Sequence, residues 1–151
     1  MLRSIDPIIS ASLLAAVHSV KAGGWIAITS RTLPAGRPSV DSSITVEQLA
    51  PALFPVLPVS SVTDTPLLAW LAEPGAEESL DAFFTVQGSA RDAERRTIEM
   101  AELSDLPSHA WDNVDTVITV ESDVDFAFFV CVGGESHDVA ALLTDRIRIA
   151  A

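Results

Sequence analysis

Apolar positions near the N-terminus recur at helical spacing. After Ser10 they repeat every three to four residues, at Leu13, Leu14, Val17 and Val20. Because serine favours helix starts and glycine favours helix ends, Ser10 and the pair Gly23 and Gly24 predict a helix over residues 11–22. The apolar run over residues 25–29 then predicts a strand.

The same alternation of helical and strand patterns continues along the chain. Thr45 and Gln48 have the spacing of a capping box and predict a second helix, although Pro51 lies inside its apolar pattern. A third helix is predicted over residues 77–86. Strands are predicted over residues 66–72, 97–103 and 126–132, and a closing strand over residues 139–149.

The segment from Pro107 to Asp125 is ambiguous. Pro107 and Ser108 indicate a helix start, whereas the β-branched residues 117–120 favour a strand. The run 126–132 is the most apolar of the chain and fits a central parallel strand that is covered on both faces. The whole pattern predicts an α/β fold, with a mostly parallel sheet and helices on both faces.

Length and charge narrow the classes of protein. At 151 residues the chain is expected to form one domain over residues 1–151. Its net charge of −12 opposes binding to nucleic acid or to an anionic membrane surface. No apolar stretch approaches the roughly 20 residues of a membrane-spanning helix. We therefore expect a soluble protein that binds neither nucleic acid nor membrane.

The single cysteine and the hydropathy bear on location and assembly. Cys131 lies in an apolar run and has no second cysteine to pair with, so we expect a buried thiol in the cytoplasm. Asp6 and Pro7 interrupt what would otherwise resemble a signal peptide. The mean hydropathy of +0.35 is high for such an acidic chain, which favours a homo-oligomer.

Histidines are the first candidates for proton transfer near neutral pH. His109 lies at a predicted junction of elements, and His137 lies in the polar segment that follows the most apolar strand, between Glu135 and Asp138. His18 falls within the first helix, where packing or an interface is the simpler interpretation. Spacings typical of a metal site, a nucleotide loop or a serine hydrolase are missing, so no metal and no cofactor are predicted.

Other residues are candidates for ligand contact. Ser30 and Arg31 open a Pro- and Gly-rich loop at the carboxyl end of a predicted strand, where open α/β sheets bind their ligands. Trp25 could stack on a sugar ring, although a single tryptophan more often packs in a core.

Short motifs along nearly the whole chain are similar to one known family. They comprise residues 1–10 followed by Leu13 and Leu14, the positions Gly23 and Ile26, the Pro34-Ala35 turn, residues 49–57, residues 66–72, the run 126–132 into Gly134 and Glu135, and Leu142 with Leu143. Taken together the sequence resembles the RbsD/FucU family, the D-ribose pyranases and L-fucose mutarotases. The resemblance implies an RbsD-like fold, a free monosaccharide as ligand, and a ring-like homo-oligomer, with a decamer as the expected size.

The catalytic pattern of that family is not kept. Its catalytic histidine falls on Ala22, the aspartate after its first strand on Ser30, and a further histidine on Gly36. Its Tyr-x-Asn motif has no counterpart, since the chain contains no tyrosine. Only Glu135 lies in a matching motif, and His109 corresponds to a basic residue of the family if an insertion follows it.

Two functional interpretations stay open. In the first, the chain is a monosaccharide-binding mutarotase-type isomerase, with His137 and His109 as acid and base and Glu135 or Asp138 orienting an imidazole. Its sugar contacts would come from Ser30, Arg31, Asp138 and Trp25. In the alternative, the chain is a non-catalytic sugar-binding or regulatory homologue, and a purely structural oligomer is a third interpretation.

Overall fold

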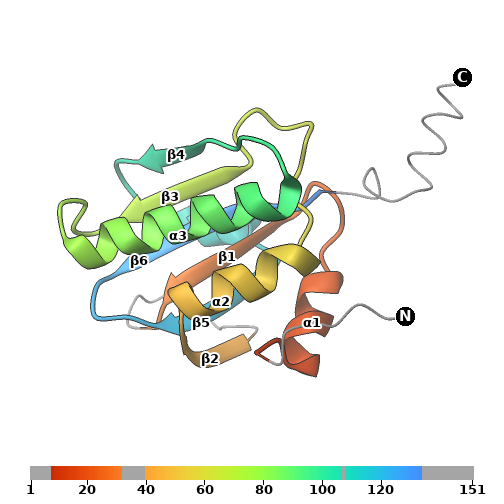
Figure 1. The fold of residues 1–151 in the computed structure, drawn as a ribbon, viewed down its shortest axis with the longest axis horizontal. Coiled ribbons are helices and arrows are strands. Elements are labelled where there is room, and N and C mark those ends of the chain that lie inside the picture. The colour runs from red at the N-terminus through yellow and green to blue at the C-terminus, as the bar shows by residue number, and fades with distance from the viewer. Residues whose placement is uncertain (1–7, 32–39, 107, 134–151) are drawn as a thin grey trace, which may run out of the picture.

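A computed structural model describes residues 8–31, 40–106 and 108–133 of the chain. Its strands are β1 (Trp25–Ser30), β2 (Val40–Thr45), β3 (Leu67–Leu71), β4 (Met100–Leu103), β5 (Thr116–Glu121) and β6 (Phe126–Cys131). Its α-helices are α1 (Ala11–His18), α2 (Val46–Leu53) and α3 (Glu77–Glu94), and two 3-10 helices are η1 (Phe54–Val56) and η2 (Ser108–Asn113). The strands form one sheet in the order β2-β5-β1-β6-β3-β4 (Figure 1).

Strand directions confirm an α/β fold with a mostly parallel sheet. The pairs β1/β5, β2/β5 and β3/β4 are parallel, whereas β6 is antiparallel to both of its neighbours, β1 and β3. The prediction of a central strand at β6 is confirmed, but its predicted parallel direction is wrong. Only residues 122–125 connect β5 to β6, and a parallel return would need a crossover of a dozen or more residues.

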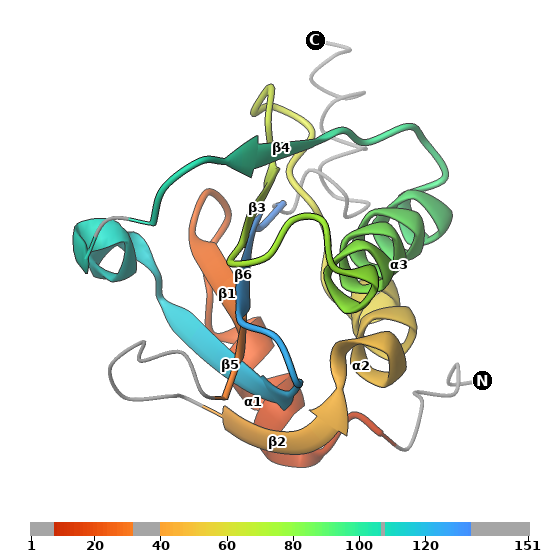
Figure 2. The same ribbon diagram turned by 90° about the vertical axis from the view of Figure 1, so that its left-hand side faces the viewer.

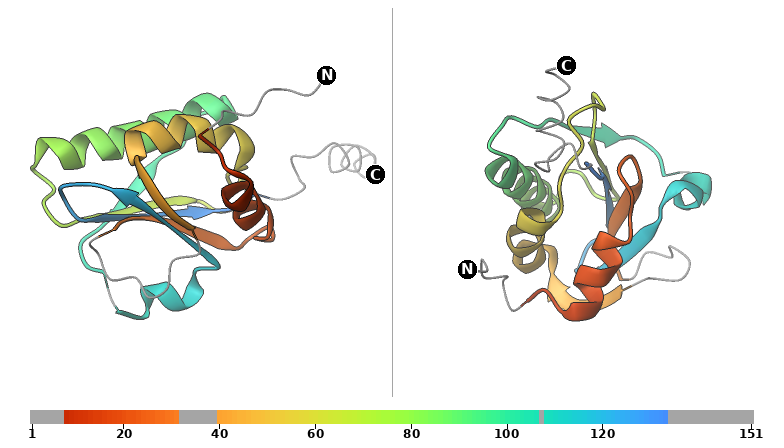
Figure 3. Two further views of the ribbon diagram at one scale, coloured as in Figure 1. Left: turned by 90° about the horizontal axis from the view of Figure 1, so that it is seen from below. Right: turned by 90° about the vertical axis from the view of Figure 1, so that its right-hand side faces the viewer.

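The larger core cluster lies between the sheet and the α-helices. Alternate residues of the strands point toward it, so Ile26 and Ile28 of β1 lie beside Phe126, Phe128 and Val130 of β6. All three α-helices contribute buried apolar side chains, including Leu13, Leu49, Leu53 and Val86. Figure 3 shows α2 and α3 running together along this side of the sheet.

The second face of the sheet has a smaller apolar cluster. Its buried members are Ala27, Val117, Ala127 and Phe129. Within the described residues this face is covered by η2 and the residues around it, on the side of the sheet away from α2 and α3 (Figure 2). Helices therefore lie on both faces, and among the described residues the helix on the second face is the short 3-10 helix η2.

Helix starts follow the predicted capping residues, whereas helix ends differ. The Ser10 side chain accepts a hydrogen bond from the Leu13 backbone N–H, and Thr45 with Gln48 forms the predicted capping box. Helix α1 ends at His18 rather than residue 22, since Val20 turns back into the core with its backbone N–H bonded to the Val17 carbonyl. Helix α3 runs eight residues beyond the predicted end and stops at Arg95, which has the left-handed φ of 58°.

The ambiguous segment contains both structures that its composition indicated. The helix start indicated by Ser108 corresponds to η2, and the strand favoured by the β-branched residues 117–120 corresponds to β5. Strand β2 was not predicted, because its Asp41, Ser42 and Ser43 are polar and it lies at the sheet edge. The predicted closing strand over residues 139–149 lies outside the described residues. No helix in the described part of the chain is long and apolar enough to cross a membrane.

Candidate functional site

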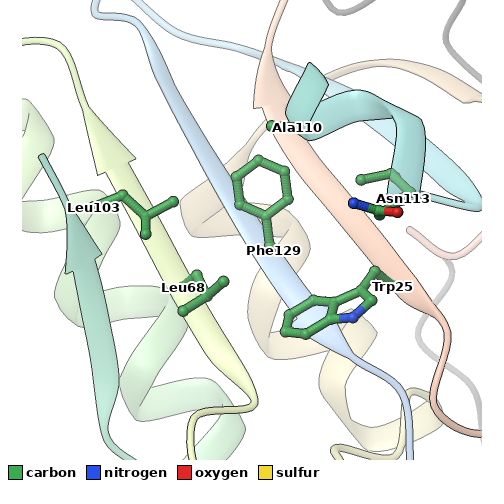
Figure 4. Close-up of a pocket in the computed structure, with 7 residues that line it drawn as sticks. Trp25, Leu68, Leu103, Ala110, Asn113 and Phe129 are labelled. Carbon is green, nitrogen blue, oxygen red and sulfur yellow. The ribbon is translucent and has the colours of Figure 1, made fainter. Parts of the chain in front are cut away.

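A cavity of about 300 Å³ opens on the second face of the sheet, next to η2. It is lined by Trp25, Leu68, Leu103, Ala110, Asn113, Val114 and Phe129 (Figure 4). Five of these side chains are wholly apolar, whereas the Trp25 indole N–H and the Asn113 amide can form hydrogen bonds. Figure 4 shows Trp25 and Asn113 on the same border of the cavity.

Backbone contacts hold that border in place. The Asp115 N–H donates to the Trp25 carbonyl at 2.9 Å, which joins the residues after η2 to the start of β1. The Trp111 ring packs against Phe129 with its centroid 5.5 Å away, and this contact fixes η2 over β6. Trp25 and Asn113 therefore come from two segments far apart in the sequence that are tied together directly beside the cavity.

The end of β6 lies at the same end of the sheet as Trp25. Trp25 pairs with Cys131, the Val132 N–H donates to the Gly24 carbonyl at 2.8 Å, and the Gly23 N–H donates to the Val132 carbonyl at 2.9 Å. Gly133 is held by its N–H to the Pro58 carbonyl at 2.7 Å. Gly133, the last described residue before Glu135 and His137 in the sequence, thus lies at this end of the sheet.

Ser30 lies at the opposite end of β1 and is fully buried. Its hydroxyl oxygen accepts a hydrogen bond from the Phe126 N–H at 3.1 Å and lies 3.3 Å from the Asp125 carboxylate, to which it donates. Five residues of strand, about 16 Å, separate Trp25 from Ser30. Ser30 therefore fastens the turn before β6 and lies far from the cavity border at Trp25.

Arg31 is held by acidic and carbonyl oxygens of β5, which neighbours β1, and of β2, the next strand along the sheet. Its guanidinium contacts Asp41 at 3.0 Å, Glu121 and the Ser42 carbonyl. Hydrogen bonds from the Thr119 hydroxyl and then from Arg31 hold the pKa of the Asp41 carboxyl below its usual value of 3.8. This network ties the edge strand β2 to β1 and β5.

A second, more polar cavity of about 210 Å³ lies beside that network. It is lined by Thr45, Glu47, Glu78, Glu121, Ser122, Asp123 and Phe126. Four of these side chains are carboxylates, at the starts of α2 and α3 and around the turn that follows β5. Such a cavity repels anions. No group of three histidine, cysteine or acidic side chains in the described ranges is placed to hold a metal ion.

The structure separates the predicted site residues into groups. Trp25 lines the sheet-face cavity, and His109 lies in η2, whose Ala110 and Asn113 line it too. Ser30 and Arg31 lie at the other end of β1. His18, expected inside the first helix, is its exposed last residue. The positions of Glu135, His137 and Asp138 lie outside the described residues.

Sequence reasoning missed most of the cavity lining. Asn113 follows Trp111 in the ambiguous segment, and this aromatic and polar pair was the one local signal for a binding surface. Leu68, Leu103 and Phe129 look like ordinary core residues in sequence. Their shared cavity arises from the pairing of β3 with β4 and β6, which no local pattern reveals.

Comparisons with known proteins identify the fold. No protein-family model matches the sequence, and no curated protein matches it. Among solved structures, FucU from Bifidobacterium longum matches with a TM-score of 0.73 and 18% identity, over 87% of this chain and 99% of that one.

Two further similar structures are described as complexes with a sugar. The fucose mutarotase in complex with L-fucose from Streptococcus pneumoniae has a TM-score of 0.66 and 14% identity, over 87% of this chain and 98% of that one. Bacillus subtilis RbsD complexed with D-ribose has a TM-score of 0.59 and 15% identity, over 89% of this chain and 98% of that one. The chain therefore has the RbsD/FucU-like fold.

Proposed function

We propose that this chain binds a free monosaccharide in the sheet-face cavity. A sugar ring combines apolar C–H faces with hydroxyl groups, and the cavity offers the Trp25 indole as a stacking surface beside the Asn113 amide. This pairing is the observation that carries the proposal. The volume of about 300 Å³ is at the lower end for ligand pockets and suits one sugar ring.

The solved neighbours support the choice of ligand class. One of them is a complex with L-fucose and another is a complex with D-ribose. In this chain Trp25 stacks on the ring and Asn113 bonds a hydroxyl, with Asp138 as a further sugar contact from the segment after Gly133. Ser30 and Arg31, which are engaged in bonds within the protein, support the far end of β1 instead.

Binding is tested by titrating the protein with a panel of aldoses and following ligand NMR signals. We expect Trp25→Ala to weaken binding of the selected sugar about tenfold or more, which corresponds to the loss of one stacking contact and its apolar burial. Trp70→Ala, which also removes a half-buried tryptophan but lies outside the cavity lining, is the matched control. Unchanged affinity of Trp25→Ala, or an absence of binding across the panel, would contradict the proposal.

Interconversion of anomers or ring forms is the second candidate, with one observation in its favour. Asp115, which follows η2, and Val132, which follows β6, are both bonded to the residues at the start of β1, and this supports a site to which His109 and the residues after Gly133 contribute. The reaction needs a base for the anomeric hydroxyl and an acid for the ring oxygen. Ala22, exposed in the turn before β1, cannot exchange a proton, so these histidines would have to do so.

The catalytic candidate is tested by saturation-transfer NMR on the sugar that binds. We expect anomer exchange to rise in proportion to protein and to fall about 100-fold or more in His109→Ala and His137→Ala, as for loss of a general acid or base. His18→Ala is the matched control, because it removes an exposed histidine at the end of α1. Binding without accelerated exchange would contradict catalysis and support the non-catalytic sugar-binding or regulatory alternative.

Location and assembly complete the proposal. The buried, unpaired Cys131 supports the expected cytoplasmic location, where thiols stay reduced. A homo-oligomer is also proposed, on the ground of the high mean hydropathy. A purely structural oligomer without a ligand would show no change of melting temperature with any sugar of the panel.

A further inference from the structure

The sheet-face cavity is polar on one border and apolar on the other. Figure 4 shows Trp25 and Asn113 on one border, Leu68 and Leu103 on the opposite border, and Phe129 between them. Of the side chains that line the cavity in the described part of the chain, only the Trp25 indole and the Asn113 amide can form hydrogen bonds, and none is charged. A ligand that fits both borders therefore needs a polar side and an apolar side.

Strand register sets the distance between the two borders. Ala27 of β1 pairs with Phe129 of β6, and Phe129 pairs in turn with Leu68 of β3. Because neighbouring strands lie about 4.8 Å apart, β3 runs about 10 Å from β1, and β4 lies one strand farther out. A sugar ring that stacks on Trp25, at the start of β1, therefore has its far side toward β3 and β4.

The apolar border disfavours sugar hydroxyl groups. Leu68 and Leu103 offer no side-chain hydrogen bond, and burying a hydroxyl group without a partner is unfavourable. Both leucines are half-buried, and so is Leu106, which packs in the same apolar cluster. An alkyl group of the ligand at this border removes their exposed parts from water, and such burial is favourable. The far side of the bound sugar is therefore expected to carry an alkyl group rather than a free hydroxyl group.

We propose that the cavity selects monosaccharides that carry a short O-alkyl group. This inference rests on the proposed binding of a sugar at Trp25 and Asn113, and it adds the class of sugar. The alkyl group extends from the ring over Leu68 and Leu103, toward the β4 edge of the described sheet, so it adds contacts without displacing the ring from Trp25. A phosphate or carboxylate group at the same place is disfavoured, since the described lining has no cation to pair with it and the chain carries a net charge of −12.

Ligand-observed NMR titration of the full chain with matched sugar derivatives tests the proposal. The sugar with the highest affinity in the aldose panel is compared with its O-methyl and O-propyl derivatives, in one series substituted at the anomeric oxygen and in another at the terminal hydroxyl group of the sugar. The methyl member is the reference because it has the same linkage. Each buried methylene group strengthens binding about fourfold, so we expect the propyl member of at least one series to bind about tenfold more tightly than the methyl member.

Variants at the apolar border separate its contribution from that of the polar border. Leu68→Ala and Leu103→Ala shorten the side chains against the alkyl group, so the ratio of the methyl to the propyl dissociation constant should fall from about ten to about three or less. Trp25→Ala should weaken binding of both members and leave their ratio unchanged. Leu14→Ala is the matched control and should keep the wild-type ratio, because it truncates a half-buried leucine of α1 that packs against the larger core cluster. Far-ultraviolet circular dichroism checks that the variants remain folded.

The outcomes distinguish this inference from the proposed function on which it rests. If the parent sugar binds but neither propyl derivative binds more tightly than its methyl partner, the ligand class is overturned while sugar binding stands. The same conclusion follows if Leu68→Ala and Leu103→Ala both keep the wild-type ratio. If no sugar of the panel binds, both the ligand class and the proposed function are overturned.

Discussion

The Glu94 carboxylate at the end of α3 accepts a hydrogen bond from the Val59 backbone N–H at 2.9 Å. Its side chain is only 9% exposed. Arg96 donates to the carbonyl oxygens of Val59 and Ser60 at 3.3 and 3.0 Å. Val59 in turn bridges Val132, so these two charged residues secure the segment that holds the end of β6.

We expect Glu94→Ala to lower the free energy of unfolding by about 1–3 kcal/mol, because it leaves the buried Val59 N–H without this acceptor. Glu94→Gln keeps an acceptor oxygen and should lose less. Urea unfolding followed by tryptophan fluorescence measures both, with Glu73→Ala as an exposed control. Equal losses for the alanine and glutamine variants would show that the hydrogen bond is not the stabilising element.

Two buried serines should respond oppositely to the same substitution. Ser30→Ala removes the acceptor for the Phe126 N–H and should destabilise by about 1–3 kcal/mol. Ser79→Ala removes a buried hydroxyl that has no hydrogen-bond partner among the described residues, so stability should stay equal or rise. Thermal unfolding of the two variants side by side makes the comparison, and a larger loss for Ser79→Ala would contradict it.

Gly133→Ala should destabilise the fold, whereas Gly75→Ala should not. A Cβ at residue 133 would lie 2.8 Å from the Val59 carbonyl oxygen, which is backbone and cannot move aside without disturbing β6. We expect a loss of about 1–3 kcal/mol, as for other overpacked positions. A Cβ at residue 75 meets nothing within 4 Å. Chemical denaturation checks both, and equal stability of the two variants would refute this account of Gly133.

Asp41 should contribute to stability in a pH-dependent manner. Its pKa is lowered by the Thr119 and Arg31 hydrogen bonds, so its contribution is fully present above the unfolded value of about 3.8 and is lost as the pH falls through the lower folded value. In Asp41→Asn the free energy of unfolding should therefore fall less steeply as the pH is lowered. Unfolding measured between about pH 2 and 6 tests this. An unchanged pH dependence would contradict the prediction, and Asp64→Asn is the control.

Much of the fold could be predicted because buried strands leave a strong pattern. The runs around Ile28, Leu67 and Phe128 are apolar wherever the strand is covered, and Thr45 with Gln48 marks a helix start by local hydrogen bonds. Strand β2 has no such pattern, since its position follows from pairing with β5. The direction of β6 depends on the short link before it rather than on its own residues.

The site was less predictable than the fold, because its lining depends on how distant segments pair rather than on local sequence patterns. Trp25 was a candidate because a tryptophan ring can stack on a sugar, which its residue type alone indicates. Asn113 joins it only because η2 folds back over β6, and Phe129 points to the cavity only because its register with Ala27 places it on that face. Ser30, predicted as a sugar contact, is engaged by the turn before β6, a partner 96 positions away in the chain.

The position of β6 bears on how the protein is made. Without β6 the strands separate into β2-β5-β1 and β3-β4, which share no hydrogen bonds, because β6 is the strand between β1 and β3. A nascent chain on the ribosome therefore cannot close its sheet until residue 131 has emerged. Until then the inner edges of both half-sheets are unpaired, so the strand order leaves these edges open to contacts with other chains during synthesis.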